Sequence, residues 1–152
     1  MQPAKGSNPP RGYRVEVIFS LHCFTRGMEN ETPATALLYS DSRETRIFDF
    51  GRYELSQRLP GIIANLMTCK CFHTGRGNFF TIEILHDQGA RVDYEIYFTA
   101  SKSSKAGIVN LYVQSAYARD PSHRGNRPRM KPISFPVILY NTLNKIPIVA
   151  PK

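Results

Sequence analysis

Residues 78–100, NFFTIEILHDQGARVDYEIYFTA, decide the fold. Apolar and polar residues alternate over 78–85 and again over 91–100, which is the period of a half-buried strand. Between the two runs lies the turn HDQGA, in which Gly89 can adopt a positive φ. The stretch therefore predicts an antiparallel hairpin. Its residues expected to face the core are Phe80, Ile82, Ile84, Val92, Tyr94, Ile96 and Phe98.

Further strands are predicted on both sides of this hairpin. Their patterns lie at 13–21, 36–40, 45–50, 108–118 and 133–141. The segments ALLYS and TRIFDF are expected to form a second hairpin, which turns on DSRE. The last segment contains Pro136, which cannot donate a ladder hydrogen bond. It is therefore predicted to be a strand at a sheet edge or one that carries a bulge.

One helix is predicted, within GRYELSQRLPGIIANLMTCK. Its apolar stripe consists of Leu55, Leu59, Ile62, Ile63 and Leu66. Pro60 is tolerated in a first helical turn and costly in a helix interior, so we expect a lead-in turn followed by a helix over 60–69. The fold class predicted is α+β, a mainly antiparallel β-sheet with one principal helix packed on one face.

The chain is predicted to hold one domain, residues 13–152, after a disordered leader, residues 1–12. No segment approaches the ~18 consecutive apolar residues that a membrane helix needs, so no membrane partner is expected. The leader has no apolar run and does not resemble a signal peptide. The three cysteines cannot all pair with one another. These features predict a cytoplasmic protein with reduced thiols.

Positive charge is concentrated in one loop. The net charge is +8, from 20 basic and 12 acidic residues. The loop over 119–131 contains a single acid, Asp120, and the basic residues Arg119, Arg124, Arg127, Arg129 and Lys131. Such a surface favours a polyanion, because neutralised phosphates release counterions. The sequence therefore predicts a nucleic-acid partner, RNA in preference to DNA.

Two groups of potential metal ligands occur, and neither predicts a metal site. CKCFH places Cys69, Cys71 and His73 at alternate positions, and LHC adds His22 and Cys23. These are zinc-ligand types, but structural zinc sites use C-x2–4-C turns that let both sulfurs converge. Buried, apolar roles are therefore expected for the cysteines.

The second group is acidic. The carboxylates of Glu83, Asp93 and Glu95 lie on adjacent predicted strands and could gather around magnesium, but they are expected to be solvated. Cofactor motifs are missing as well. The chain has no P-loop and no G-x-S-x-G, and HTGRGNF has two glycines without a following helix. No cofactor is predicted.

A third group lies at the ends of predicted strands. It contains His73 and Arg76 in FHTGRGNFF, Ser115, Tyr117 and Arg119 in QSAYARD, and Tyr140, Asn141 and Thr142 in ILYNT. Cleavage of RNA by its own 2′-hydroxyl needs an acid, a base and cations around the phosphate, but no metal. His73 is an acid or base near neutral pH. Arg76 and Arg119 can hold a phosphate bidentately, and Tyr117 can stack on a base.

In layout, residues 53–147 resemble the barnase–EndoU–colicin–RelE group of small metal-independent RNases, which occur as toxins and in mobile elements. The shared features are a basic chain, a helix followed by a four-stranded antiparallel run, and His, Arg, Ser/Thr and Tyr at strand ends. The resemblance implies that His73 is the acid/base. It implies phosphate-holding roles for Arg76 and Arg119, with Ser115, Tyr117 and Thr142 assisting. The strands before the helix depart from that layout.

Two other functions stay open. The first is a non-catalytic module that binds nucleic acid or protein as a subunit of a larger defence or mobile-element assembly. The second is a domain that binds an acidic protein, such as an antitoxin or inhibitor, and shows little affinity for nucleic acid. Part of the third group is structural if Asp120 holds Arg119 locally, or if Tyr117 simply covers the edge of the core.

Overall fold

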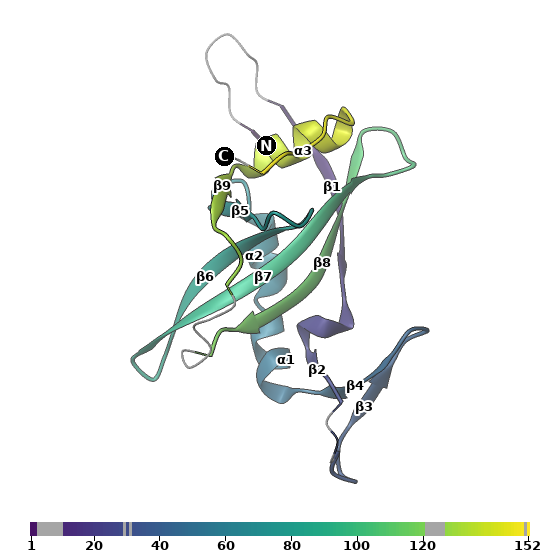
Figure 1. The fold of residues 1–152 in the computed structure, drawn as a ribbon, viewed down its shortest axis with the longest axis vertical. Coiled ribbons are helices and arrows are strands. Elements are labelled where there is room, and N and C mark those ends of the chain that lie inside the picture. Colours follow the sequence, from purple (N-terminus) through teal and green to yellow (C-terminus); the bar gives the residue numbers. More distant parts are fainter. Residues whose placement is uncertain (3–10, 29, 31, 121–126, 151) are drawn as a thin grey trace.

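The computed structural model describes all residues except 3–10, 29, 31, 121–126 and 151, and contains two sheets (Figure 1). The larger has the order β1-β8-β7-β6-β5-β9, and the smaller β2-β4-β3. The strands are β1 (Arg14–Phe19), β2 (Thr25–Arg26), β3 (Leu38–Ser40), β4 (Thr45–Phe48), β5 (Cys71–His73), β6 (Phe79–Asp87), β7 (Ala90–Lys102), β8 (Ile108–Ala118) and β9 (Lys131–Ile133). The helices are η1 (Leu21–Cys23, a 3-10 turn), α1 (Phe50–Ser56), α2 (Leu59–Ala64) and α3 (Phe135–Leu143).

The hairpin predicted over 78–100 is confirmed. Strands β6 and β7 pair antiparallel from Phe79 opposite Phe98 to Asp87 opposite Ala90. The two residues between the strands, Gln88 and Gly89, have φ values of 47° and 82°. A two-residue turn with positive φ matches the twist of the flanking strands, which is why the glycine is placed there.

The predicted fold class is confirmed, with one parallel pair inside it. Strands β5 to β8 are antiparallel neighbours, and the second hairpin forms as β3 and β4. Strand β1 instead pairs parallel to β8, with Arg14 opposite Ile108 and Phe19 opposite Val113. It occupies the outer edge of the sheet on that side (Figure 1).

The predicted helix over 60–69 is corrected. The expected lead-in turn is the helix α1, whose first turn Asp49 caps by accepting the backbone N–H of Arg52. Helix α2 has a proline in its first turn, as expected, but ends at Ala64. The prediction placed the end too far along because Leu66 continues the apolar stripe; it is buried in the turn that follows the helix.

The strand predicted over 133–141 is wrong, because this segment forms the helix α3. Pro136 stands in its first turn, where the missing N–H costs nothing. Its buried residues, Phe135, Ile138 and Leu139, have the i, i+3, i+4 spacing of one helical face. The ring of Phe135 packs edge-on against Phe98 of β7.

The predicted inner face of β6 is also corrected. Phe79 lies in the core beneath the helices, whereas Ile84 is 49% exposed. A one-residue change of register reverses both faces of a strand. Phe80 is still buried, but on the opposite face, in a row of rings that crosses the sheet. The row consists of Phe72, Phe80, Tyr97 and Tyr117, with successive ring centres 5.2, 5.2 and 5.8 Å apart.

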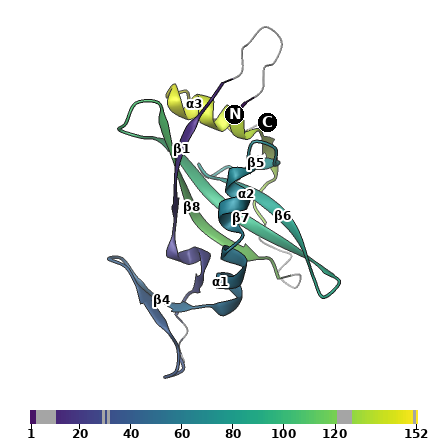
Figure 2. The same cartoon turned by 180° about the vertical axis from the view of Figure 1, so that it is seen from behind.

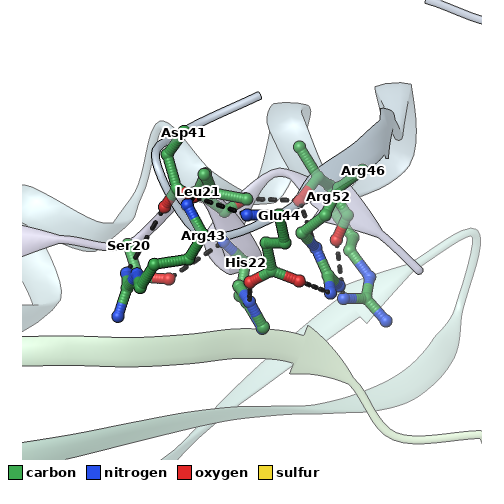
Figure 3. Close-up of polar contacts among 9 residues, drawn as sticks. Ser20, Leu21, His22, Asp41, Arg43, Glu44, Arg46 and Arg52 are labelled. Atoms are coloured by element: carbon green, nitrogen blue, oxygen red, sulfur yellow. Dashed lines mark hydrogen bonds and ion pairs between the residues drawn. The ribbon is translucent and has the colours of Figure 1, made fainter. Parts of the chain in front are cut away.

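The smaller sheet forms an arm that extends away from the larger one (Figure 2). Polar contacts hold its base (Figure 3): Glu44 bonds to the ring of His22 and accepts from Arg46 at 3.3 Å. The Arg46 guanidinium also donates to the hydroxyl of Thr25 at 2.9 Å, and Arg52 donates to the Thr25 carbonyl at 2.9 Å. These contacts fasten β4 to η1, β2 and α1.

Candidate anion-binding site

A basic pocket of about 850 Å³ opens on the sheet face that the helices leave uncovered. Its walls are the turn 74–78, between β5 and β6, and the segment 127–129, which leads into β9. Tyr97 of β7 also lines it. We call this the arginine pocket. Its main polar side chains are Thr74, Arg76, Asn78, Tyr97, Arg127 and Arg129.

The sequence TGRGN builds the first wall as a tight turn. Gly75 and Gly77 have φ values of 84° and 83°, which side chains with a Cβ rarely adopt. The Thr74 N–H donates to the Asn78 carbonyl at 3.1 Å, and the Arg76 N–H donates to the Thr74 hydroxyl at 3.1 Å. The Asn78 amide in turn donates to Gln114 of β8 at 2.9 Å. This bonding presents the Arg76 side chain at the tip of a fixed turn.

The second wall is anchored by a buried carboxylate. Glu95 has no exposed surface, and it accepts hydrogen bonds from Arg127 Nε at 2.7 Å, Arg119 Nη2 at 2.9 Å and the Tyr97 hydroxyl at 2.7 Å. Arg127 also donates to Asp93 at 3.0 Å. The expectation that Glu95 is solvated was wrong. Both described ends of the basic loop are therefore tied to one carboxylate.

The pKa values of these groups follow from the same contacts. Burial alone would raise the pKa of the Glu95 carboxyl, but hydrogen bonds from Arg119, Tyr97 and Arg127 outweigh it and lower that pKa. Hydrogen bonds from Arg127 and Arg91 lower the pKa of Asp93. The carboxylate of Glu95 raises the pKa of Arg119. All of these groups are therefore ionised near neutral pH.

The arginines of the pocket fall into two kinds. Arg127 is neutralised locally by Asp93 and Glu95, as Arg119 is by Glu95. Arg76 and Arg129 are exposed, and among the described residues no acidic side chain pairs with either. These two guanidinium groups retain their hydrogen-bonding capacity for an anion in the pocket.

The structure does not bring His73 to this pocket. His73 pairs with Phe79, a core residue, and only 4% of its surface is exposed. Its Nδ1 accepts the N–H of Gly75 at 2.8 Å, so that nitrogen carries no proton. Tyr117 lies on the opposite face of the sheet, because its neighbour Ala116 faces the core. The sheet thus separates the expected acid/base from Ser115 and Tyr117, two of its expected helpers.

The remaining candidate residues are scattered. Ser115 lies opposite Tyr97, and Tyr117 stacks on the Tyr97 ring, with the Arg52 guanidinium 5.7 Å from its own ring centre. Thr142 belongs to α3, since the predicted strand that was to carry it does not form. Lys131 lies opposite His73 in β9, and Arg124 lies outside the described residues.

The three cysteines are free thiols, and Cys23 and Cys71 are buried. Burial raises the pKa of Cys23 to about 11 and that of Cys71 to about 12, so both remain protonated at neutral pH. Across the part of the chain that the structure describes, no three His, Cys, Asp or Glu side chains gather in a group that could hold a metal ion.

Three lining residues escaped the sequence analysis: Thr74, Asn78 and Tyr97. Two glycines spaced around Arg76 were a usable signal for the turn, since glycines at such spacing supply positive φ. Tyr97 had a usable signal as well, because its neighbours Ile96 and Phe98 face the core and successive side chains of a strand lie on opposite faces. Within the described residues, no helix is long and apolar enough to cross a membrane.

Comparison with known proteins gives a family and one curated relative. The model of the YjaZ family matches residues 1–143. Protein YjaZ of Escherichia coli strain K12 is 34% identical over 137 residues, which cover 88% of this chain and 73% of the relative. No solved structure matches.

Proposed function

The chain belongs to the YjaZ family, and we propose that it is a cytosolic protein that binds the sugar–phosphate backbone of a nucleic acid in the arginine pocket. The proposed ligand is RNA in preference to DNA. The Asn78 amide lines the pocket with the arginines and has a second N–H besides the one that it gives to Gln114, which is a donor for a ribose 2′-hydroxyl as well as for phosphate.

The observation that carries this proposal is the exposure of Arg76 and Arg129 in one pocket without acidic partners among the described residues. A guanidinium group binds a phosphate through two parallel N–H bonds, which gives both charge and orientation. Arg127 adds a third guanidinium group whose position is already fixed by Glu95. A net charge of +8 adds long-range attraction for a polyanion.

Binding without cleavage has more support than cleavage. A general base must come within hydrogen-bonding reach of the proton that it removes. His73 lies on the other face of the sheet, with Nδ1 occupied by Gly75, so the metal-independent RNase mechanism is left without its acid/base. Incubation with generic RNA and a chelator tests this directly, because cleavage would release fragments with 2′,3′-cyclic phosphate ends.

A salt titration tests the binding. For a single-stranded oligonucleotide, the slope of log K against log salt is about −0.7 for each phosphate contact. We expect Arg76→Ala and Arg129→Ala each to reduce that slope by ~0.7 and to weaken binding at low salt. Arg43→Ala, in the turn between β3 and β4, removes the same charge from a residue that pairs with Asp41 and should leave the slope unchanged. Equal losses in all three variants would show that only total charge matters and would overturn the pocket assignment.

The second candidate function is protein binding, and the arm favours it. Five rings, those of Phe24, Tyr39, Phe48, Phe50 and Tyr53, form one cluster around Phe48. Phe50 is 70% exposed, and clustered exposed rings are typical of protein interfaces. Residues 21–58, which include η1, the arm and α1, carry five basic and six acidic residues, so this region does not favour a polyanion. Oligonucleotide affinity that does not change with salt would favour this function over the first.

A further inference from the structure

The free edge of β1 is apolar on both of its faces. Val17, Ile18 and Phe19 are consecutive residues of this strand and are 36%, 54% and 40% exposed. Strand β1 pairs with β8 on one side only, and no described strand pairs with its other side. Figures 1 and 2 show β1 as the outermost strand of the large sheet in both views. A long apolar edge is a template for pairing with another strand.

The backbone groups that face this free edge can be identified. The N–H of Ser20, directly after β1, donates to the Val113 carbonyl of β8 at 3.0 Å. Successive residues of a strand direct their N–H and C=O groups to opposite sides. Ile18 and Glu16 therefore bond toward β8, and the N–H and C=O groups of Val15, Val17 and Phe19 point outward along the free edge.

The same three residues also face an apolar hollow. An open pocket of about 400 Å³ lies between β1, α2 and α3. Val15, Val17 and Phe19 line it from the strand, and Ile63, Met67 and Phe135 are among the residues that line it from the helical side. A neighbouring strand with apolar residues at alternate positions would extend this lining.

A second copy of β1 satisfies these conditions. In an antiparallel pair centred on Val17, each Val17 lies opposite its equivalent and each Val15 lies opposite Phe19. All three residues have outward backbone groups, so every opposed pair exchanges two hydrogen bonds. The apolar side chains then meet on one face, which is what sets the register of a half-buried strand.

Charge is compatible with this pairing. Strand β1 contains one acid and one base, Glu16 and Arg14, within a chain of net charge +8. Glu16 is also paired with Lys105 of the same chain at 2.9 Å. Two copies that meet along β1 therefore bring neutral surfaces together and keep the excess charge of each chain away from the contact.

We propose that the chain forms a two-fold symmetric dimer through antiparallel pairing of β1 with β1 of a second copy, which joins the two large sheets into one. The proposal is independent of nucleic-acid binding, since none of the residues involved lines the arginine pocket. A two-fold interface needs a self-complementary patch, and this strand provides one in both its hydrogen bonds and its apolar residues.

Sedimentation velocity of the full chain over a range of concentrations tests the dimer. The wild type should shift from monomer to dimer as concentration rises. Val17→Lys should weaken association at least ~10-fold, because it places two ammonium groups against each other at the symmetry axis. Val17→Pro removes an outward N–H without removing a bond to β8, and its effect should be similar. Ile84→Lys changes a more exposed apolar residue, in β6, and should leave association unchanged.

Cross-linking tests the register. In a Cys69→Ser background, Val17→Cys should form a disulfide-linked dimer on mild oxidation, and Ile84→Cys should not. Circular dichroism shows whether each variant is folded, and the lysine variant keeps the test valid if the proline variant is not. A wild type that stays monomeric at every concentration would overturn the proposal. So would a dimer that persists in folded Val17→Lys.

Discussion

Arg127 Nε donates to Glu95 Oε1 at 2.7 Å, and this contact joins the loop before β9 to the middle of β7. Arg119, at the other end of the same loop, bonds to the same carboxylate. The Glu95 carboxylate therefore fixes where the basic loop leaves the sheet and where it returns. Arg129, two residues after Arg127, lines the arginine pocket together with Arg76.

Glu95→Gln is expected to lower the free energy of unfolding by about 2–4 kcal/mol, because it removes the buried counter-charge that Arg119 and Arg127 share and leaves Arg127 with Asp93. Urea denaturation measures this loss. Glu54→Gln, at an exposed position of α1, should change it by less than about 0.5 kcal/mol. Glu95→Gln also frees positive charge beside the pocket, so its oligonucleotide binding at low salt should be tighter than that of the wild type. A variant as stable as the wild type would contradict this account of Glu95.

The free energy of unfolding should fall at acidic pH, because the Glu95 carboxylate becomes protonated there. The folded-state pKa of Glu95 is lowered below its ordinary value, and so is that of Asp93. The contribution of these two carboxylates to the free energy of unfolding is therefore fully present above the ordinary carboxyl pKa of about 4. It is lost as the pH falls through their lowered folded-state pKa values. Denaturation at a series of pH values should show the wild type converging on Glu95→Gln at low pH. A gap between them that stays constant to the lowest pH would contradict the assignment.

We expect the His73 side chain to stabilise the folded chain. His73→Ala leaves the Gly75 N–H without its acceptor and removes a ring that packs against Phe79, which should cost about 1–3 kcal/mol. His73→Asn supplies an oxygen acceptor near the position of Nδ1 and should recover part of that loss. Thermal unfolding of both variants measures the effect. If the wild type cleaved RNA in the presence of a chelator, and His73→Ala lost that cleavage at unchanged stability, the catalytic role of His73 would be restored.

Alanine substitutions in α3 test the helix against the strand that the sequence predicted. In a helix, Ile138 and Leu139 share the buried face, and each substitution should cost about 2–5 kcal/mol. In a strand, adjacent residues lie on opposite faces, so one of the two would be nearly neutral. Val137→Ala is the matched control, because Val137 is exposed. Chemical denaturation of the three variants decides between the two structures.

The sequence predicted those parts of the fold in which the local pattern is unambiguous. The alternation over 91–100 and the glycine at 89 required an antiparallel hairpin, and the structure contains it. Adjacent phenylalanines at 79 and 80 allowed both choices of inner face, and both rings are in fact buried, on opposite faces. The run FPVIL fits a strand as well as a buried helix, and in the structure Phe135, Ile138 and Leu139 pack into the core as one helical face.

The candidate site was harder to predict, because charge pairing depends on contacts between distant residues. Arg76 and Arg129 were chosen together with Arg119 and Arg127, and nothing local separates the two kinds. The distinction comes from Glu95, a buried carboxylate that accepts hydrogen bonds from Arg119 and Arg127. The sequence likewise placed His73 at the end of a strand, directly before the turn 74–78. The face of the sheet on which its side chain lies depends on its pairing with Phe79, which is not a local feature.

The parallel pairing of β1 with β8 has a consequence for synthesis of the chain. Arg14 leaves the ribosome 94 residues before its partner Ile108. Until then the apolar stretch VEVIF has no place to bind, and it is exposed to chaperones and to other nascent chains. Sequence-distant pairing of this kind also slows folding, so the first strand is expected to be among the last to be incorporated.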